Sequence, residues 1–272
     1  MRRSVPTWLR EARAQANAPP RRPRDRLLLG TSNATHEVGS IEPEIAARLA
    51  VAGLPFARHG DGWTIRPPFD ASLAFVARWL HEAGLAGRWR DELLPVVTRS
   101  GRRLAAVERS VVRVLGLSTF AVHLNGRAAD GGFWVQQRAF DKASDPGRWD
   151  TLMGGQMAAG ESILSTLERE TAEEAGLALD QLRSLRRGAD LSVRRPLAEG
   201  FMTERIAVFH ATLAPDVVPV NRDGEVERFE CLGEPSLRAR LAAGEFTLEA
   251  TLILGAAIES RRREPWAPAK RA

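Results

Sequence analysis

The sequence predicts an α/β protein with two domains: a small α+β domain at residues 26–115 and a domain with a mixed sheet between helical layers at residues 116–262. Three observations lead to this prediction. Strand-like runs lie on both sides of one helix that follows a glycine-rich loop, and further helices follow the last strand. The segment before residue 115 mixes short helices and strands without repeats. A length of 272 residues is enough for one large or two ordinary domains.

The sequence of the first part of the chain predicts short helices and strands that follow one another closely. Residues 1–25 form a basic N-terminal extension, with a short helix at 6–15 and a Pro/Arg linker. Strands follow at 27–29 and 36–41, then a helix at 43–53 and a hairpin of strands 56–58 and 63–66. Helices at 70–84, 89–97 and 105–115 complete this domain.

The second part is richer in strands. Strands are expected at 118–124 and 132–138, joined around the turn dipeptide Asn125-Gly126, and again at 190–194, 200–213 and 225–232. Helices at 235–242 and 247–260 follow, and residues 263–272 are a tail. The fold expected is therefore a mixed sheet covered by helices on both sides.

Composition narrows the function classes. The net charge is +5 and nearly all basic residues are arginines, but they are spread along the chain. Nucleic-acid binding would require a clustered basic face with stacking aromatics, so a small anionic substrate is favoured instead. No apolar run approaches the ~20 residues of a membrane span. The single cysteine, Cys231, excludes an internal disulfide, fits a reducing cytoplasm, and is expected to be a buried, inert thiol.

Three carboxylates indicate a metal site. Glu170, Glu173 and Glu174 stand at i, i+3 and i+4, so in a helix they share one face about 5–6 Å apart. A solvated acidic face is the simpler interpretation. A hard cation such as Mg²⁺ would relieve their repulsion, because it prefers oxygen ligands and keeps water and substrate phosphates in its remaining positions.

The spacing around these carboxylates resembles the Nudix box. The motif Gly-x5-Glu-x7-Arg-Glu-U-x-Glu-Glu-x-Gly-U, with U aliphatic, is matched by Gly155, Glu161, Arg169, Glu170, Glu173, Glu174, Gly176 and Leu177. Thr171 departs from it at the first U position. The chain thus resembles a Nudix hydrolase, which implies a Nudix-type α/β/α sandwich.

The resemblance also implies roles for the box residues. Glu170, Glu173 and Glu174 would bind Mg²⁺, with Mn²⁺ as an alternative, and act in catalysis. Glu161 and Arg169 complete the catalytic set as residues that hold the loop against the helix. Gly154 and Gly155 would allow the backbone to approach metal or phosphate.

Residues outside the box extend the predicted site. Nudix enzymes often add a later glutamate as metal ligand or base, and Glu225 and Glu227 are the candidates here. Arg138 and Lys142 would hold the diphosphate of the substrate. A thiamine-like ring would need an aromatic or apolar pocket next to the metal, and Trp134, Phe140 and Trp149 lie near the box in the sequence. A place in the core is the simpler interpretation for each of them.

The wider resemblance is to the thiamine pyrophosphokinase-related branch, whose members carry an extra N-terminal domain. It implies hydrolysis of thiamine diphosphate, or of its oxidised forms, to the monophosphate. Two alternatives remain: a pyrophosphatase for a nucleoside diphosphate derivative such as ADP-ribose or a dinucleotide, and a non-catalytic module that senses a ligand. The intact box argues for catalysis. We expect no nucleic-acid or membrane partner, and keep a homodimer as an alternative to a monomer.

Overall fold

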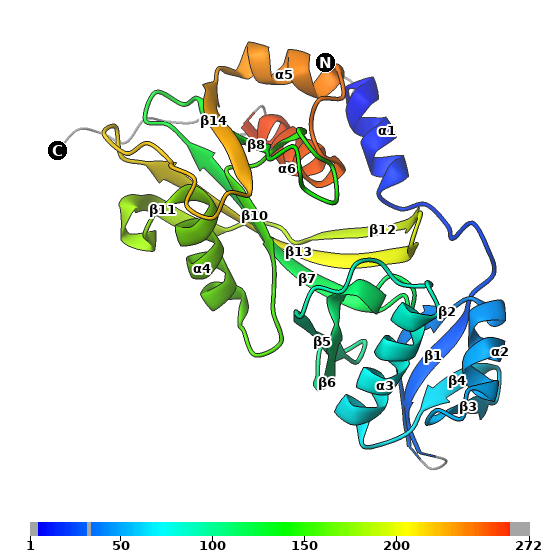
Figure 1. Cartoon of the computed structure of the whole chain (residues 1–272). Coiled ribbons are helices and arrows are strands. Elements are labelled where there is room, and N and C mark those ends of the chain that lie inside the picture. Colours follow the sequence, from blue (N-terminus) through cyan, green and yellow to red (C-terminus); the bar gives the residue numbers. More distant parts are fainter. Residues whose placement is uncertain (1–4, 32–33, 262–272) are drawn as a thin grey trace.

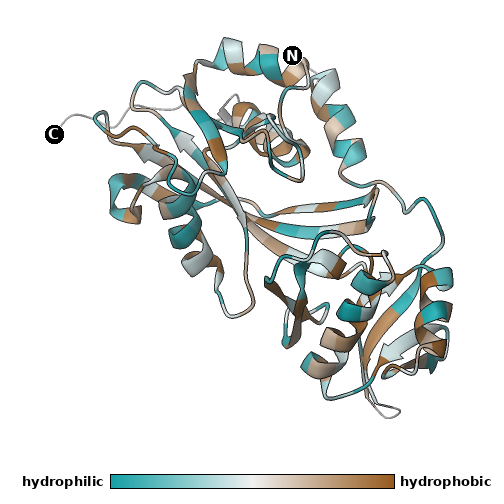
Figure 2. Cartoon of the chain, in the orientation of Figure 1, coloured by the Kyte–Doolittle hydropathy of each residue, from teal (hydrophilic) through white to brown (hydrophobic). Residues whose placement is uncertain are grey.

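The computed structural model describes residues 5–31 and 34–261, arranged as a smaller and a larger lobe (Figure 1). The smaller lobe is built on a sheet with strand order β2-β1-β4-β3. Its strands are β1 (Asp25–Gly30), β2 (Thr35–Ile41), β3 (Phe56–His59) and β4 (Gly62–Ile65), and its helices are α2 (Pro43–Val51) and α3 (Phe69–Glu82). Strand β1 is largely hydrophobic, whereas much of helix α4 (Ile163–Ala175) in the other lobe is hydrophilic (Figure 2). These elements confirm the α+β prediction up to residue 82.

Two helices predicted after residue 82 are wrong. Residues 89–97 and 105–115 contain instead an antiparallel pair, β5 (Leu93–Val97) and β6 (Arg103–Glu108), followed by the short 3-10 helix η1 (Arg109–Val111). Pro95 lacks an N–H and disfavours a helix interior, and the β-branched Val96 and Val97 favour a strand. Because β5 pairs only with β6, Pro95 is accommodated at a sheet edge.

The larger lobe contains a mixed sheet whose main strand order is β11-β13-β7-β8-β14. The pair β7–β13 is parallel, and the other pairs of this sheet are antiparallel. Its strands are β7 (Ser118–Arg127), β8 (Phe133–Arg138), β9 (Trp149–Asp150), β10 (Met153–Gln156), β11 (Leu182–Arg187), β12 (Leu191–Leu197), β13 (Gly200–Leu213) and β14 (Val226–Leu232). This mixed sheet confirms the predicted fold class.

Helices cover both faces of this sheet, as alternation along the strands requires. On β7, Val122 and Leu124 face α4 (Ile163–Ala175) and share a core with Leu167. Ala121, which precedes Val122, faces the other side, in a core with Leu252 of α6 (Leu248–Arg261). Helix α5 (Glu234–Ala242) follows β14 and packs with α6 through Leu237 and Leu254.

The N-terminal helix α1 (Thr7–Gln15) belongs to the core of the larger lobe. Leu9 is fully buried in the α6-side core, and a Cβ on Gly255 of α6 would lie 2.8 Å from a Leu9 methyl carbon. Arg13 also forms a 2.9 Å ion pair with Glu259. Over the described residues, the predicted extension therefore supplies a packed helix rather than a free arm.

Two local predictions in the larger lobe are wrong. Asn125 and Gly126 lie inside β7 rather than in a turn, and the chain reverses at Ala128–Gly132, where the Ala128 N–H donates to the Gly132 carbonyl. Gly126 is needed there because a Cβ would lie 2.3 Å from Leu152. Cys231 is exposed rather than buried, since its side chain alternates away from the core that Leu232 enters.

Backbone hydrogen bonds join the two lobes. The Ala159 N–H, in the loop before α4, donates to the Leu93 carbonyl of β5 at 2.8 Å. The Phe201 N–H at the start of β13 donates to the Arg113 carbonyl at 2.9 Å. Gly200 lies so close to this segment that a Cβ would be 2.3 Å from the Arg113 oxygen. The smaller lobe is thus fixed beside the loop that leads into α4.

Candidate active site

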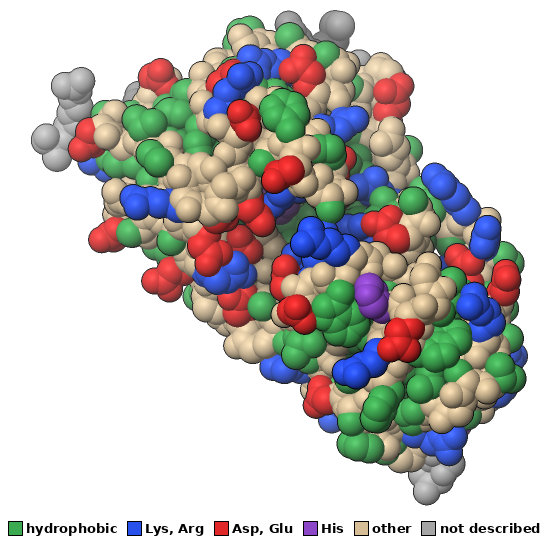
Figure 3. Space-filling model, in the orientation of Figure 1, with side chains coloured by type: hydrophobic (Ala, Val, Ile, Leu, Met, Phe, Trp, Pro, Cys, Tyr) green, Lys and Arg blue, Asp and Glu red, His purple; other side chains and the backbone are tan. Residues whose placement is uncertain are grey.

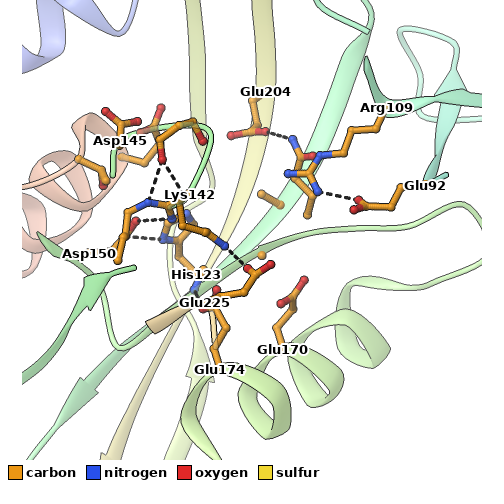
Figure 4. Close-up of a pocket in the computed structure, with 18 of the residues that line it drawn as sticks. Glu92, Arg109, His123, Lys142, Asp145, Asp150, Glu170, Glu174, Glu204 and Glu225 are labelled. Carbon is orange, nitrogen blue, oxygen red and sulfur yellow. Dashed lines mark hydrogen bonds and ion pairs between the residues drawn. The ribbon is translucent and has the colours of Figure 1, made fainter. Parts of the chain in front are cut away.

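A polar cavity of about 380 Å³ lies between the two lobes. Acidic and basic side chains gather around the hollow between them (Figure 3). The larger lobe contributes Glu170, Glu173 and Glu174 of α4, and the smaller lobe contributes Glu92 and Arg109 (Figure 4). The cavity therefore collects the predicted carboxylates and adds a wall that the sequence did not predict.

Helix α4 is held at both ends. Ser162 is its N-cap and accepts a hydrogen bond from the Ser165 N–H at 3.1 Å, while the Ser165 hydroxyl accepts from the Ser162 N–H. Gly176 ends it with φ of 64°, the left-handed conformation that glycine adopts most readily. These caps fix the helix whose one face carries the carboxylates.

Arg169 joins the loop to the helix. Its guanidinium contacts Glu161 Oε1 at 2.5 Å, Glu170 at 2.9 Å and Glu173 at 3.0 Å. The hydrogen bond from Arg169 is the main cause that lowers the pKa of Glu161 to about 2. The Ala158 N–H and the Thr166 hydroxyl also donate to Glu161. This is the loop-to-helix bridge expected of Glu161 and Arg169.

Two carboxylates of α4 are buried and poorly compensated. Glu174 is 2% exposed and Glu170 is 9% exposed, whereas the Glu173 side chain is about half exposed. Burial raises the pKa of Glu170 to about 7 and, together with the negative charge of Glu170, raises that of Glu174 to about 8. Glu174 accepts hydrogen bonds from Gln136 Nε2 and from the Gly154 N–H, both at 3.0 Å. The folded chain therefore disfavours charge on both groups in the absence of a cation.

The two glycines of β10 lie directly against these groups. A Cβ on Gly155 would lie 1.9 Å from the Glu170 carboxyl carbon, and one on Gly154 would lie 2.5 Å from the His123 ring. Any larger residue at position 155 would displace the Glu170 carboxylate. Gly155 is thus required for the close approach of β10 to α4.

The structure separates the two later glutamates. Glu225 lines the cavity and pairs with Lys142, while Glu227 is exposed and lies outside the cavity lining. A register shift between Val226 and Arg228 breaks the alternation that would have put both carboxylates on one face. Burial opposes charge on Glu225, but the hydrogen bond from Lys142 and nearby arginines outweigh it and lower its pKa. Glu225 alone joins the carboxylates of α4.

The predicted cationic residues line the cavity, but the predicted aromatic residues do not. Arg138 reaches Asp150 at 3.6 Å and donates to the Ser144 carbonyl at 3.1 Å. Trp149 packs in the α5–α6 core, Trp134 against the α4-side core, and Phe140 is 66% exposed. The two tryptophans therefore follow the simpler interpretation of core packing, Phe140 lies at the surface, and the three rings do not form a pocket beside the α4 carboxylates.

Sequence reasoning missed several cavity residues on the side of the sheet that α6 covers. Glu204, Arg195 and Glu249 come from β13, β12 and α6, and His123 donates to or accepts from Thr151 at 2.9 Å. Glu204 carries the one signal that could have been found, since it interrupts the apolar alternation of Met202 and Ile206 on a buried face. The others have no local pattern that distinguishes them from surface charges.

The donor set fits a hard divalent cation by its chemistry. Glu170, Glu173, Glu174 and Glu225 offer only oxygen ligands, and the two buried ones lack full charge compensation. Within the described ranges, however, no three of the acidic, histidine and cysteine side chains converge closely enough to form a ready ligand cluster. Arg169 and Lys142 instead contact three of these carboxylates. Such an open site suits Mg²⁺, which takes its remaining ligands from water and phosphate.

Comparisons with known proteins agree with this geometry. Residues 115–249 match the model of the NUDIX domain. Nudix hydrolase 24, chloroplastic, of Arabidopsis thaliana is 27% identical over 190 residues, which cover 65% of this chain and 51% of that protein. A Nudix hydrolase of Deinococcus radiodurans is 30% identical over 119 residues, covering 44% of this chain and 66% of that protein.

A solved structure supports the fold. The crystal structure of DR0079 from Deinococcus radiodurans superposes with a TM-score of 0.50 at 24% identity, covering 61% of this chain and 98% of that chain. The chain spans about half the length of the Arabidopsis relative. In the part of the chain that the structure describes, none of the helices has the length and apolar composition of a membrane span.

Proposed function

We propose that this protein is a Mg²⁺-dependent diphosphohydrolase that cleaves the diphosphate of a small molecule, with Mn²⁺ as an alternative metal. The observation that carries the proposal is the pair of buried carboxylates, Glu170 against Gly155 and Glu174 bonded to the Gly154 N–H, at one side of a cavity with cationic walls. Burying such groups costs free energy unless a cation or proton compensates them, and a functional site is where this cost is commonly retained.

The residues of this chain have distinct roles in the proposed reaction. Glu170, Glu173, Glu174 and Glu225 would hold the metal, which supplies Lewis-acid polarisation of the phosphoryl group and a more acidic water. A water oxygen attacks one phosphorus of the diphosphate, the bond from that phosphorus to the bridging oxygen breaks, and the other phosphate leaves with the bridging oxygen. Glu170 or Glu174 would accept the water proton, since both carboxylates line the cavity.

The cations of the cavity complete the proposal. Arg138 and Lys142 would bind the substrate phosphates in place of their present contacts with Asp150 and Glu225. Glu161 and Arg169 act as positioning residues, since their ion pair holds the loop against α4. Arg109 brings a further guanidinium from the smaller lobe to the same cavity.

For the specific substrate, the sequence resemblance supports thiamine diphosphate or its oxidised forms, cleaved to the monophosphate. The cavity lining favours a second candidate. Its walls are mostly charged and amide side chains, and the three predicted aromatic residues lie elsewhere. The ribose hydroxyls of ADP-ribose or another nucleoside diphosphate derivative offer more hydrogen-bonding groups to such polar walls than thiamine does.

The experiment is a hydrolysis panel with and without Mg²⁺, followed by chromatography of the monophosphate products and by release of inorganic phosphate. It contains thiamine diphosphate, its oxidised forms, ADP-ribose, dinucleoside polyphosphates and NADH. Turnover of one compound that stops when the metal is removed would support the proposal, and preference between the two groups would identify the substrate. Binding of a ligand without any turnover would refute the enzyme and support a sensor module.

The cellular setting is part of the proposal. A cytoplasmic protein without nucleic-acid or membrane partners is supported by the single cysteine and by the scattered arginines. Size-exclusion chromatography with light scattering would distinguish a monomer from the alternative homodimer.

A further inference from the structure

The cavity continues from the α4 carboxylates onto the α6 face of the sheet. Its lining there includes Arg195, Glu204 and Glu249, with Gln156 at the end of β10. Along β10, Gly155 faces Glu170 of α4, whereas its neighbour Gly154 faces His123 on the opposite side. Gln156 follows this alternation and bonds to Glu204 at 3.0 Å. The α6-side part of the cavity therefore lies on the other side of β10 from the proposed metal ligands, within the same continuous cavity.

Three polar atoms in this part of the cavity lack hydrogen-bond partners among the described residues. They are Glu249 Oε1, Gln156 Oε1 and Arg195 Nε, and each is almost inaccessible to solvent. Glu249 is 8% exposed, and its Oε1 lies 3.6 Å from the Arg195 guanidinium, which is beyond hydrogen-bonding distance. Leaving a buried polar atom without a hydrogen bond costs about 1–3 kcal/mol of folding free energy, so these three atoms destabilise the folded protein unless a ligand forms hydrogen bonds with them.

The unpaired atoms specify the chemistry of that ligand. Two of the three are acceptors, and Glu204 and Asp150 add negative charge around Glu249. Burial and these neighbours raise the pKa of Glu249 to about 7. An N–H donor placed against the carboxylate would relieve both the missing hydrogen bond and the unfavourable charge. Arg195 Nε offers one donor to an acceptor atom of the same ligand.

We propose that Glu249, Gln156 and Arg195 form the subsite that recognises the organic group attached to the diphosphate, and that this group is an amino-substituted nitrogen heterocycle. Its amino group donates to Glu249 and Gln156, and a ring nitrogen or carbonyl oxygen accepts from Arg195. The inference rests on the proposed function because it assigns the part of the substrate that is not cleaved. Glu249 is in this respect a specificity residue and not a metal ligand.

The test measures equilibrium binding by calorimetry in Mg²⁺ buffer. AMP and thiamine monophosphate carry amino-substituted rings, inosine monophosphate carries a carbonyl in place of the purine amino group, and ribose 5-phosphate has no ring base. We expect AMP or thiamine monophosphate to bind at least tenfold more tightly than ribose 5-phosphate, and inosine monophosphate to bind more weakly than AMP. Equal affinities of the wild-type protein for all four compounds would overturn the proposal.

Variants at position 249 make the test specific. Glu249→Met removes both acceptors at similar volume and is expected to weaken binding of the preferred ring compound at least tenfold, with less than a twofold change for ribose 5-phosphate. If the Met variant does not fold, Glu249→Gln, which keeps the shape of the side chain, replaces it in the test. We expect this variant to lose at least threefold in affinity for the preferred ring compound. Glu259→Gln on the same helix is the control. Equal losses for both kinds of ligand, or none, would overturn the proposal.

The outcome is separable from that of the proposed function. If the hydrolysis panel shows no turnover but the Glu249 variants still lose ring binding, the subsite stands and the diphosphohydrolase fails. If metal-dependent turnover is found and the Glu249 variants bind every compound as the wild type does, the subsite alone fails.

Discussion

Replacing Glu174 with glutamine tests whether ionisation of this buried carboxylate destabilises the folded protein. Glu174 is fully buried, and its pKa rises from the ordinary 4.5 to about 8 in the folded protein. The folded state therefore keeps a proton that the unfolded state has lost, and stability falls as the pH rises from 4.5 through 8. At about 1.36 kcal/mol for each pKa unit, the loss at pH 8 reaches about 4 kcal/mol in the metal-free protein.

Glu174→Gln should remove this loss. The amide keeps the shape and an acceptor for Gln136 and the Gly154 N–H, so we expect the metal-free variant to be about 1–4 kcal/mol more stable than the wild type at pH 8. At pH 4.5 the two proteins should differ little. With Mg²⁺ at 100 times its dissociation constant, the wild type should gain about 2.7 kcal/mol that the variant does not.

The assay is urea unfolding at pH 5, 6, 7 and 8, with chelator or with Mg²⁺, followed by tryptophan fluorescence. The variant should also lose most of its turnover. The metal-free variant could be no more stable than the wild type at pH 8, or its advantage could be the same at pH 5. Either result would show that burial does not raise the pKa of Glu174 and does not lower the stability of the folded protein at pH 8.

Three further changes test other parts of the structure. Glu170→Gln should lower metal-dependent turnover by about 10²–10⁴-fold, with a melting temperature that does not fall, and unchanged turnover in the phosphate-release assay would remove Glu170 from the mechanism. Gly155→Ala should abolish Mg²⁺ binding in calorimetry because its methyl group would meet the Glu170 carboxyl, while Gly87→Ala, at an open position, should bind as the wild type does. Leu9→Ala should cost about 2–5 kcal/mol in urea unfolding, whereas Leu164→Ala on the surface should cost under about 0.5 kcal/mol; equal costs would contradict the packing of α1 into the core.

The sequence could predict those parts of the site that lie in one continuous segment. The box spacing located Glu170 and Glu174 and the bridge from Arg169 to Glu161, because all of them depend on one loop and one helix. It could not predict Glu249, which meets Arg195 only when α6 packs over β12, since no local pattern records that contact. The strands β5 and β6 also depend on pairing between two segments, which local apolar spacing does not record, and that spacing alone favoured helices.

The packing of α1 on α6 has a consequence for how the protein is made. The ion pair of Arg13 with Glu259 joins residues 246 positions apart, and Leu9 and Leu252 share a core. The smaller lobe, by contrast, draws its sheet and core from residues 25–117 and can fold as soon as these leave the ribosome. The larger lobe cannot complete its core before α6 has been synthesised, so α1 must stay unpaired until then.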